Sequence, residues 1–408
     1  MLKRISVQHL RPGMFLQEFC GSWMDHPFWR SKFLIEDPQD IQRVMASSIR
    51  EIWIDTSKGL DVEGGQVQEE ADIEVAEVLA RAEQFDEVVQ KANLQDEMDR
   101  AARIVAKAGE AVSSMFKEVR MGKALDANDA LPLVEEISNS VMRNPGALIS
   151  LARLKNKDNY TYMHSVAVCA LMVALARQLG MDEAATRKAG MAGLLHDVGK
   201  MAIPDEILDK PGRLTDEEFD IIKSHPMQGH RMLLEGSGVD DVALDVCLHH
   251  HEKVDGSGYP DKLADQQISL YAKMGAVCDV YDAITSNRPY KNGWDPAESL
   301  RKMAEWSKGH FDAVVFQAFV KSVGIYPIGS LVRLESGRIG VVIDQTEKSL
   351  LTPKVKVFYS TKSKLRIAPE VLDLSAPKVR DKIVAREDPE KWNFSDLNEL
   401  WGGVELWD

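Results

Sequence analysis

The apolar positions between about residues 70 and 325 follow a helical pattern almost throughout. They recur at spacings of three and four, which places them along one face of an α-helix. This pattern predicts a mainly α protein. The clearest segments are residues 73–89, 131–154, 164–179 and 273–285.

Two local signals mark boundaries within this helical region. Thr215 and Glu218 form a capping box, in which the threonine accepts from the turn and the glutamate reaches back to it. The box predicts a helix that starts there and ends near His225 and Pro226. Residues 286–294, in contrast, are loop-like.

The first 65 residues have a mixed pattern, typical of a small α+β unit. Residues 28–35 and 49–55 are predicted to be strands. Asp37-Pro38 predicts a short helix after the first of them, because proline is favourable in the first helical turn. The polar stretch Gly64-Gly65-Gln66 is typical of a linker.

After residue 325 the pattern changes to short strands separated by glycines and polar turns. The last 25 or so residues are charged and contain Trp392, Trp401 and Trp407, so we expect a tail that is loosely ordered or docked on another surface. The predicted strands are residues 331–334, 339–343 and 354–358. The predicted organisation is a small α+β N-terminal domain (1–65), a helical linker (66–125), a helical catalytic domain (126–325) and a β-rich C-terminal extension with its tail (326–408).

Composition narrows the class of protein. With 64 acidic and 50 basic side chains the net charge is −14, which argues against a general nucleic-acid coat but leaves room for a local basic pocket. The longest apolar run, residues 166–176, is shorter than the roughly 20 residues that cross a bilayer. The N-terminus lacks the apolar stretch of a signal peptide. Four cysteines without paired spacing fit a reduced cytoplasm, so we expect a cytoplasmic protein without membrane insertion: Cys20, Cys169, Cys247 and Cys278.

Seven histidine and aspartate residues form a candidate metal site. They come from four separate helical segments, so a helix bundle is needed to bring them together. Imidazole and carboxylate ligands without thiolate suit iron, manganese or zinc. Asp197 can bridge two cations with its two oxygens, and a metal pair about 3.5–4 Å apart is common in phosphoester hydrolysis. The seven are His164, His196, Asp197, His225, His250, His251 and Asp279.

Taken singly, several of these residues have a plain structural interpretation. His164 could be a core residue, His225 a helix-end residue favoured by the helix dipole, and Asp279 a partner of Lys273. The joint pattern favours metal binding instead. His249 is interpreted as a packing or supporting residue beside the ligands. Structural roles are assigned to His9, His26, His230 and His310.

The motifs that carry these residues resemble the HD-GYP family, a branch of the HD-domain metal-dependent phosphohydrolases. Five blocks occur in family order over roughly residues 150–300, and residues 1–65 resemble a small domain that often precedes this module. The blocks are His196-Asp197-Val198-Gly199-Lys200; residues 203–215; His225-Pro226 with Gly229; His250-His251-Glu252-Lys253 through Asp255 to Gly258-Tyr259-Pro260; and Asp279-Val280-Tyr281-Asp282 through Thr285 to Arg288 and Lys291.

The resemblance implies an all-α HD-type bundle that hydrolyses cyclic-di-GMP through pGpG to GMP and so lowers the level of a bacterial second messenger. It implies metal binding by the seven residues above and phosphate contact by Lys200. It also implies ligand contact by Arg288 and Lys291, which could instead be solvated loop charges. Gly258, Tyr259 and Pro260 form a loop that the family links to contacts with diguanylate cyclase domains.

One departure from the family bears on the number of metals. Some members hold a third metal with a glutamate one turn before the first histidine, where this chain has Tyr160. We therefore expect two divalent ions, iron or manganese, with Asp197 and a hydroxide bridging them. His164, His196, Asp197 and Asp279 would hold one ion, and Asp197, His225, His250 and His251 the other.

Three functions remain open at this point. The first is the cyclic-di-GMP phosphodiesterase, with Asp197 and Lys200 as its catalytic residues. Its helical stretch 70–125 could form a homodimer or only connect domains. The second is a phosphohydrolase of another nucleotide, because the metal ligands would be the same. The third is a non-catalytic module that binds cyclic-di-GMP or a cyclase domain, although none of the seven ligands is missing.

Overall fold

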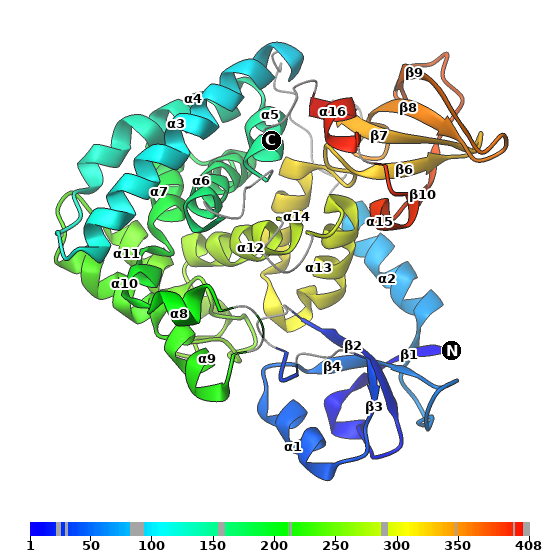
Figure 1. Ribbon diagram of the computed structural model, residues 1–408, viewed down its shortest axis with the longest axis horizontal. Coiled ribbons are helices and arrows are strands. Elements are labelled where there is room, and N and C mark those ends of the chain that lie inside the picture. Colours follow the sequence, from blue (N-terminus) through cyan, green and yellow to red (C-terminus); the bar gives the residue numbers. More distant parts are fainter. Residues whose placement is uncertain are drawn as a thin grey trace.

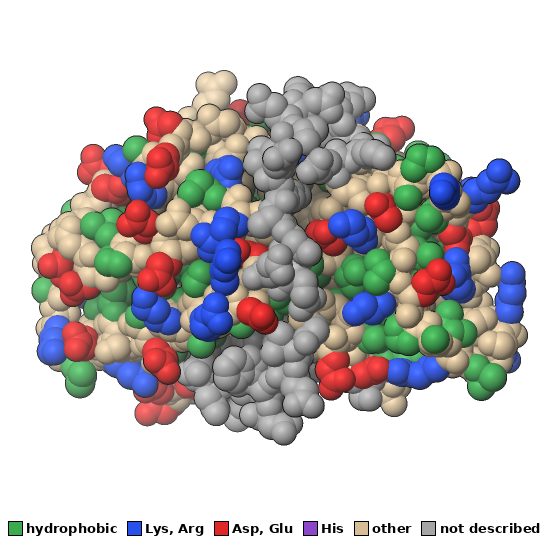
Figure 2. Space-filling model, turned by 90° about the horizontal axis from the view of Figure 1, so that it is seen from above, with side chains coloured by type: hydrophobic (Ala, Val, Ile, Leu, Met, Phe, Trp, Pro, Cys, Tyr) green, Lys and Arg blue, Asp and Glu red, His purple; other side chains and the backbone are tan. Residues whose placement is uncertain are grey.

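The computed structural model describes residues 1–21, 26–28, 32–81, 94–153, 160–210, 212, 214–286, 293–346, 349–394 and 396–402. A helical bundle occupies most of the molecule. The N-terminal residues form one small sheet, and residues near the C-terminus form another (Figure 1). The chain is therefore mainly α, with a small α+β region at its N-terminus and a β-rich region near its C-terminus, as predicted. Both sheets are antiparallel. On the face shown in Figure 2, lysines and arginines are interspersed with aspartates and glutamates.

The N-terminal sheet contains five antiparallel strands in the order β3-β2-β4-β1-β5. Its core is a small cluster that includes Leu16, Phe19, Ile52 and Ile54, all almost fully buried. The elements are β1 (Leu2–Ser6), β2 (Phe15–Cys20), β3 (Phe33–Leu34), α1 (Pro38–Ala46), β4 (Glu51–Asp55) and β5 (Gln66–Val67).

Three details of this region differ from the predictions. The strand expected over residues 28–35 is only Phe33–Leu34, and residues 29–31 lie outside the described part of the chain. Gln66, expected in a linker, instead begins edge strand β5, which pairs with β1. β1 and β2 were not predicted. The helix after Asp37 and the strand near residues 49–55 are confirmed.

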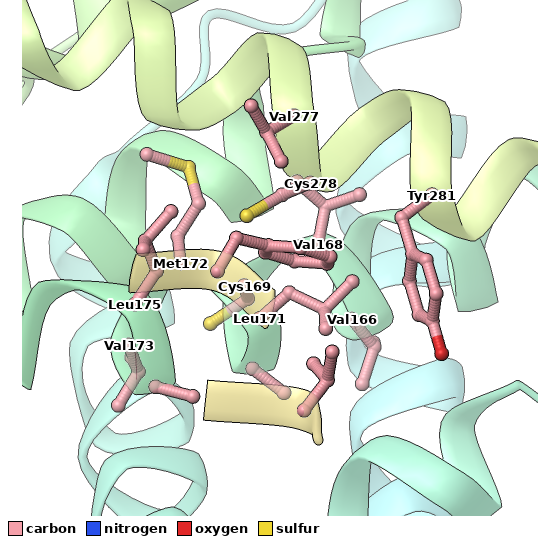
Figure 3. Close-up of a cluster of buried hydrophobic side chains, with 14 of the residues drawn as sticks. Val166, Val168, Cys169, Leu171, Met172, Val173, Leu175, Val277, Cys278 and Tyr281 are labelled. Carbon is pink, nitrogen blue, oxygen red and sulfur yellow. The ribbon is translucent and has the colours of Figure 1, made fainter. Parts of the chain in front are cut away.

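The bundle is built around α6, whose residues from Met163 to Ala176 are all buried. A helix that is apolar on all sides must be surrounded by others. Figure 3 shows its side chains packed against those of α12, among them Val277, Cys278 and Tyr281. The helices are α2 (Gln68–Ala80), α3 (Leu94–Arg120), α4 (Leu131–Arg143), α5 (Pro145–Ala152), α6 (Tyr160–Gln178), α7 (Glu183–Leu195), α8 (Asp205–Leu208), α9 (Asp216–Lys223), α10 (His225–Leu234), α11 (Asp241–His249), α12 (Leu270–Thr285), α13 (Pro296–His310) and α14 (Ala313–Val323), with short 3₁₀ turns η1 (Val7–His9), η4 (Ala127–Ala130), η6 (Val198–Ala202) and η7 (Asp265–Gln267).

Helix boundaries follow local chemistry. The single helix expected over residues 131–154 is two helices, because Pro145 cannot continue α4 and instead starts α5, with Asn144 as its cap. The capping box at Thr215 is present and α9 follows it. α3 packs its apolar face into the main core, through residues such as Met98 and Phe116. Whether residues 70–125 mediate dimerisation or only connect domains stays a prediction.

The C-terminal sheet has five antiparallel strands in the order β10-β6-β7-β8-β9. The described part of the tail is docked on it: Phe394 stands edge-on to Phe358, with ring centroids 4.9 Å apart, and Trp401 is buried. Trp407 lies outside the described residues. The elements are β6 (Leu331–Leu334), β7 (Arg338–Asp344), β8 (Lys354–Ser360), β9 (Leu365–Asp373), β10 (Ile383–Arg386), α15 (Pro389–Trp392) and α16 (Leu397–Gly402).

Among the described residues, no helix is both long and apolar enough to cross a membrane.

Candidate metal centre

The seven candidate ligands lie together in the interior of the bundle. They come from five helices or helix ends: α6, the C-terminus of α7, the first residue of α10, the C-terminus of α11, and the middle of α12. Sequence reasoning counted four segments, one fewer than the structure has. Ligand atoms within 4.8 Å of one another define two groups. The first group is His164, His196, Asp197 and Asp279, and the second is His225, His250 and His251.

Asp197 lies between the two groups and presents one oxygen to each. Its Oδ2 is 3.3 Å from Nε2 of His164 and 3.4 Å from Nε2 of His196. Its Oδ1 is 3.2 Å from Nε2 of His225 and 3.8 Å from Nε2 of His250. This carboxylate therefore has the geometry to bridge two cations.

Hydrogen bonds orient four of the imidazoles in the same way. Each places Nδ1 against an acceptor: a carboxylate oxygen for His164 and backbone carbonyls for the other three. Nδ1 then carries a proton, so Nε2 is the ring atom that faces the centre and that a cation would bind. The Nε2 atoms of His164 and His196 are 3.2 Å apart, and those of His225 and His250 are 3.3 Å apart. The four rings are His164, His196, His225 and His250.

Such an arrangement of lone pairs and carboxylates fits metal cations. Facing imidazole nitrogens repel each other unless a positive charge lies between them. Oδ1 of Asp197 is buried and, among the described residues, has no hydrogen-bond partner. A buried, unsatisfied carboxylate oxygen is costly, and a cation would satisfy it.

Burial and neighbouring charged groups together set the protonation states of the centre. The pKa of His250 is lowered to about 3 and that of His251 is lowered too, chiefly because burial penalises the charged ring. Burial acts to raise the pKa of Asp197 and Asp279, but neighbouring cationic and hydrogen-bonding groups hold both well below the usual value. His250 and His251 are thus neutral and the two carboxylates ionised, as metal ligands must be. Burial also acts to lower the pKa of His164, but its hydrogen bonds to Asp197, Asp279 and Asp282 raise that pKa to about 10.

Two glycines of the sequence motifs allow the ligand-bearing elements to meet. A Cβ on Gly199 would lie 1.9 Å from the carbonyl oxygen of His225 and 2.4 Å from the backbone nitrogen of Gly229. Hence η6, which follows Asp197, packs backbone to backbone against α10, which begins with His225. Any side chain at Gly199 would push these two ligands apart.

Two supporting carboxylates were not assigned a role from the sequence. Asp282 accepts a hydrogen bond from Nδ1 of His164 at 2.6 Å and so fixes the orientation of that ring. Asp279 and Asp282 are three residues apart on one helix and so lie on the same face. This spacing could have identified Asp282 from the sequence. Glu252 is buried and accepts from the backbone N–H groups of Asp261 at 2.7 Å and Leu263 at 3.1 Å, which holds the segment after the Gly-Tyr-Pro turn.

The Gly258-Tyr259-Pro260 turn lies directly against the second ligand group. The backbone N–H of Tyr259 donates to the carbonyl of His251 at 3.2 Å. The rings of Tyr259 and His251 are stacked, with centroids 4.7 Å apart. The turn therefore supports His251 from one side.

The other residues that were considered for the site lie outside the two ligand groups or outside the described part of the chain. Lys200 lies on η6 with its Nζ in contact with Oδ2 of Asp197. Arg288 and Lys291 lie outside the described residues, as does the side chain of Tyr160 at the start of α6. His249 bonds to Asp245 and Asp261 and takes no part in either ligand group. His9, His26, His230 and His310 also lie outside both groups.

A cavity of about 2540 Å³ opens beside the centre. His164, His251, Asp279 and Lys200 line it on the metal side. It is wide enough for a ligand much larger than a mononucleotide, since pockets for small molecules are typically about 300–1,000 Å³.

Sequence matches to known proteins support a metal centre at this position. Residues 2–130 match a domain of unknown function, DUF3391, and residues 138–315 match the HD domain. The chain is 57% identical over 405 residues to a cyclic di-GMP phosphodiesterase of Pseudomonas aeruginosa, covering 99% of this chain and 96% of the relative. A cyclic di-GMP phosphodiesterase of Thermotoga maritima is 39% identical over 166 residues, which are 40% of this chain and 45% of that protein.

A further relative carries a different substrate in its name. A 3'3'-cGAMP-specific phosphodiesterase 1 of Vibrio cholerae is 35% identical over 167 residues, which are 41% of this chain and 38% of the relative. The full-length match in Pseudomonas aeruginosa, the HD domain and the seven clustered ligands all agree. The chain belongs to the HD-GYP family of cyclic di-GMP phosphodiesterases.

Proposed function

We propose that this protein hydrolyses cyclic-di-GMP at a dinuclear metal centre, through linear pGpG to GMP. The observation that supports it most is the placement of Asp197, with one oxygen turned to each of two ligand groups at the wall of a large cavity. The full-length relative named for this activity supports the substrate.

The proposed ligand sets follow the two groups. His164, His196, Asp197 and Asp279 would hold one divalent ion, and Asp197 with His225, His250 and His251 the other. When bound, such ions lower the pKa of a water molecule, so that hydroxide is available near neutral pH, and offset the charge that builds on the phosphoryl group. Iron or manganese suits a set of imidazoles and carboxylates.

The chain's own residues orient the reaction. Asp282 keeps the lone pair of His164 Nε2 directed inward, and backbone carbonyls do the same for His196, His225 and His250. Lys200, held at Oδ2 of Asp197, can turn its ammonium group to a phosphoryl oxygen as a point charge. The scissile phosphate would lie on the cavity side of the centre, within reach of Lys200, which lines the cavity.

A turnover assay on purified protein tests this function. Incubation with cyclic-di-GMP and Mn(II) or Fe(II), followed by chromatography, should show pGpG first and GMP later. The His196→Ala/Asp197→Ala double variant should bind no metal and give no product. Intact substrate with metal-loaded wild-type protein, or wild-type turnover by the double variant, would refute the proposal.

Substrate choice needs a panel rather than one compound. The match to a 3'3'-cGAMP-specific relative shows that closely similar catalytic domains carry different substrates in their names. Cyclic-di-GMP should have the highest kcat/KM in a panel with 3'3'-cGAMP, pGpG and nucleoside monophosphates. A higher value for 3'3'-cGAMP would move the assignment to the hybrid dinucleotide.

Gly258 and Tyr259 of the Gly-Tyr-Pro turn line the cavity, and this turn extends the proposal to partners. The family resemblance implies contact with diguanylate cyclase domains there. Tyr259→Ala should then weaken co-purification with a cyclase domain. Unchanged co-purification would remove this part of the proposal.

A further inference from the structure

The cavity beside the metal centre is enclosed by three separate parts of the chain. The helical bundle supplies the metal-side wall, the N-terminal domain supplies residues of α1 and of the segment leading into β4, and residues 386–394 of the C-terminal extension add a third side. Figure 1 shows α1 and the N-terminal sheet beside α9 and α13. The N-terminal domain therefore faces the substrate space.

A buried polar network fixes the N-terminal domain against α13. The indole N–H of Trp53 donates to the carboxylate of Glu305, and Arg4 donates to the carbonyl of Glu305 at 3.3 Å. Lys302 pairs with Glu18 at 2.7 Å. Glu305 is buried, so breaking these contacts would leave a charge without its partners. This wall is consequently held in place.

The cavity is basic although the chain is acidic. Among the described residues that line it, thirteen are lysine or arginine and nine are aspartate or glutamate, in a chain with a net charge of −14. A local excess of positive charge in a concave site attracts anions. A cyclic dinucleotide carries two phosphates, and only one can occupy the metal centre at a time.

Arg43 and Arg50 on the N-terminal wall are available for the other phosphate. Their side chains are 50% and 60% exposed, and the carboxylates that pair with them among the described residues, Asp216 and Asp255, are both 3.9 Å away. Ion pairs at this distance and exposure contribute little, so a ligand can displace them. The guanidinium of Arg43 also lies 5.9 Å from the ring centre of Phe28, on the same wall.

We infer that Arg43 and Arg50 of the N-terminal domain bind the half of the cyclic dinucleotide that is not being cleaved. The planar fork of arginine fits two phosphate oxygens, or O6 and N7 of guanine. The inference rests on the proposed function, because it names the residues that hold the second nucleotide of that substrate. It makes the N-terminal domain part of the substrate site.

The effects of variants on two substrates of different size distinguish a role in binding the second nucleotide from a structural role. In this inference cyclic-di-GMP reaches from the metal centre to the N-terminal wall, whereas bis(p-nitrophenyl) phosphate has no second nucleotide and needs only the metal centre. Arg43→Ala and Arg50→Ala should each raise KM for cyclic-di-GMP about tenfold or more, the scale of one lost hydrogen bond to a charged group. kcat, metal content and turnover of bis(p-nitrophenyl) phosphate should stay unchanged, and Arg50→Lys should restore part of the loss.

Arg11→Ala is the matched control, because Arg11 is an exposed arginine of the same domain that does not line the cavity. Unchanged KM for cyclic-di-GMP in both arginine variants would overturn this inference and leave the proposed function intact. Equal losses on both substrates, or loss of metal, would also overturn it, since they indicate a structural role. Wild-type protein that cleaves bis(p-nitrophenyl) phosphate but not cyclic-di-GMP would refute the proposed function itself.

Discussion

At the scale of single residues, the centre depends on hydrogen bonds that fix which nitrogen of each imidazole faces inward. Three of the rings use backbone carbonyls for this purpose, which no side-chain substitution removes. His164 differs, because its Nδ1 donates to the Asp282 carboxylate. Asp282 is therefore the position where the orientation of a ligand can be tested by mutation.

Asp282→Ala should lower metal affinity by about 10–100-fold, the usual effect of removing such a supporting carboxylate. Asp282→Asn keeps an acceptor oxygen and should lose less. Metal titration followed by elemental analysis measures both.

Asp245→Ala provides the control, because Asp245 accepts from His249 at 2.8 Å in the same carboxylate–histidine geometry but outside the ligand groups. Equal metal loss in the Asp245 and Asp282 variants would show that the effect is a general loss of stability.

At the scale of elements, the ligands meet because helix ends and turns approach one another without intervening side chains. The contact between Gly199 on η6 and Gly229 on α10 is the clearest case. It connects the His-Asp motif to the His225 motif, which are separate signals in the sequence.

Gly199→Ala should abolish metal binding, because a Cβ 1.9 Å from the His225 carbonyl forces α10 away from Asp197. Metal content and circular dichroism together measure the effect, and near-native helix content is expected.

Gly122→Ala is the control: its φ of 85° makes alanine unfavourable, but no atom lies within 4 Å of the added Cβ. It should cost about 1–2 kcal/mol of stability and retain metal. A Gly199→Ala protein with full metal content would contradict the role given to this contact.

Asp295 connects α13 to the C-terminal sheet and is sensitive to pH. Its carboxylate accepts from the backbone N–H groups of Ala297 and Glu298 at the start of α13 and of Leu331 at the start of β6. Burial nevertheless raises its pKa to about 6. The folded protein therefore keeps a proton on Asp295 that the unfolded chain loses near pH 4.

Ionising Asp295 should cost stability between about pH 4 and pH 6, by about 3 kcal/mol at most. Asp295→Asn keeps a capping oxygen and lacks the titration. The Tm of wild-type protein should thus fall relative to that of Asp295→Asn as pH rises through this window, and stay parallel above pH 7. Parallel Tm curves from pH 4 to pH 7 would contradict the raised pKa.

At the scale of the whole molecule, the overall charge and the charge of the substrate cavity have opposite signs. Mixed charges cover the face seen in Figure 2, whereas lysines and arginines are in excess around the cavity. Association with an anionic substrate responds to the local field more than to the net charge.

The kcat/KM for cyclic-di-GMP should therefore fall several-fold as KCl is raised from about 20 mM to about 300 mM, because salt screens the attraction. If the net charge of −14 dominated, kcat/KM would rise instead. Bis(p-nitrophenyl) phosphate, with one charge, should respond less.

Much of this molecule follows from local patterns in the sequence. α6 and α12 were predicted because their apolar residues recur at spacings of three and four, and the ligands were recognisable from the His-Asp and His-His-Glu motifs. β9 was not predicted, because nearly all of its residues are exposed or partly exposed and leave no alternating pattern. The wall formed by Arg43 and Arg50 was equally invisible, since it depends on contacts such as Trp53 with Glu305, which lie far apart in the chain.

The enclosure of one cavity by residues from Gln17 to Phe394 has a consequence for engineering and for evolution. A chimaera that carries only the helical module would keep its reactive centre but present it in an open groove. Exchanging the N-terminal domain between homologues should for the same reason alter which nucleotides are accepted, while the reaction itself stays the same.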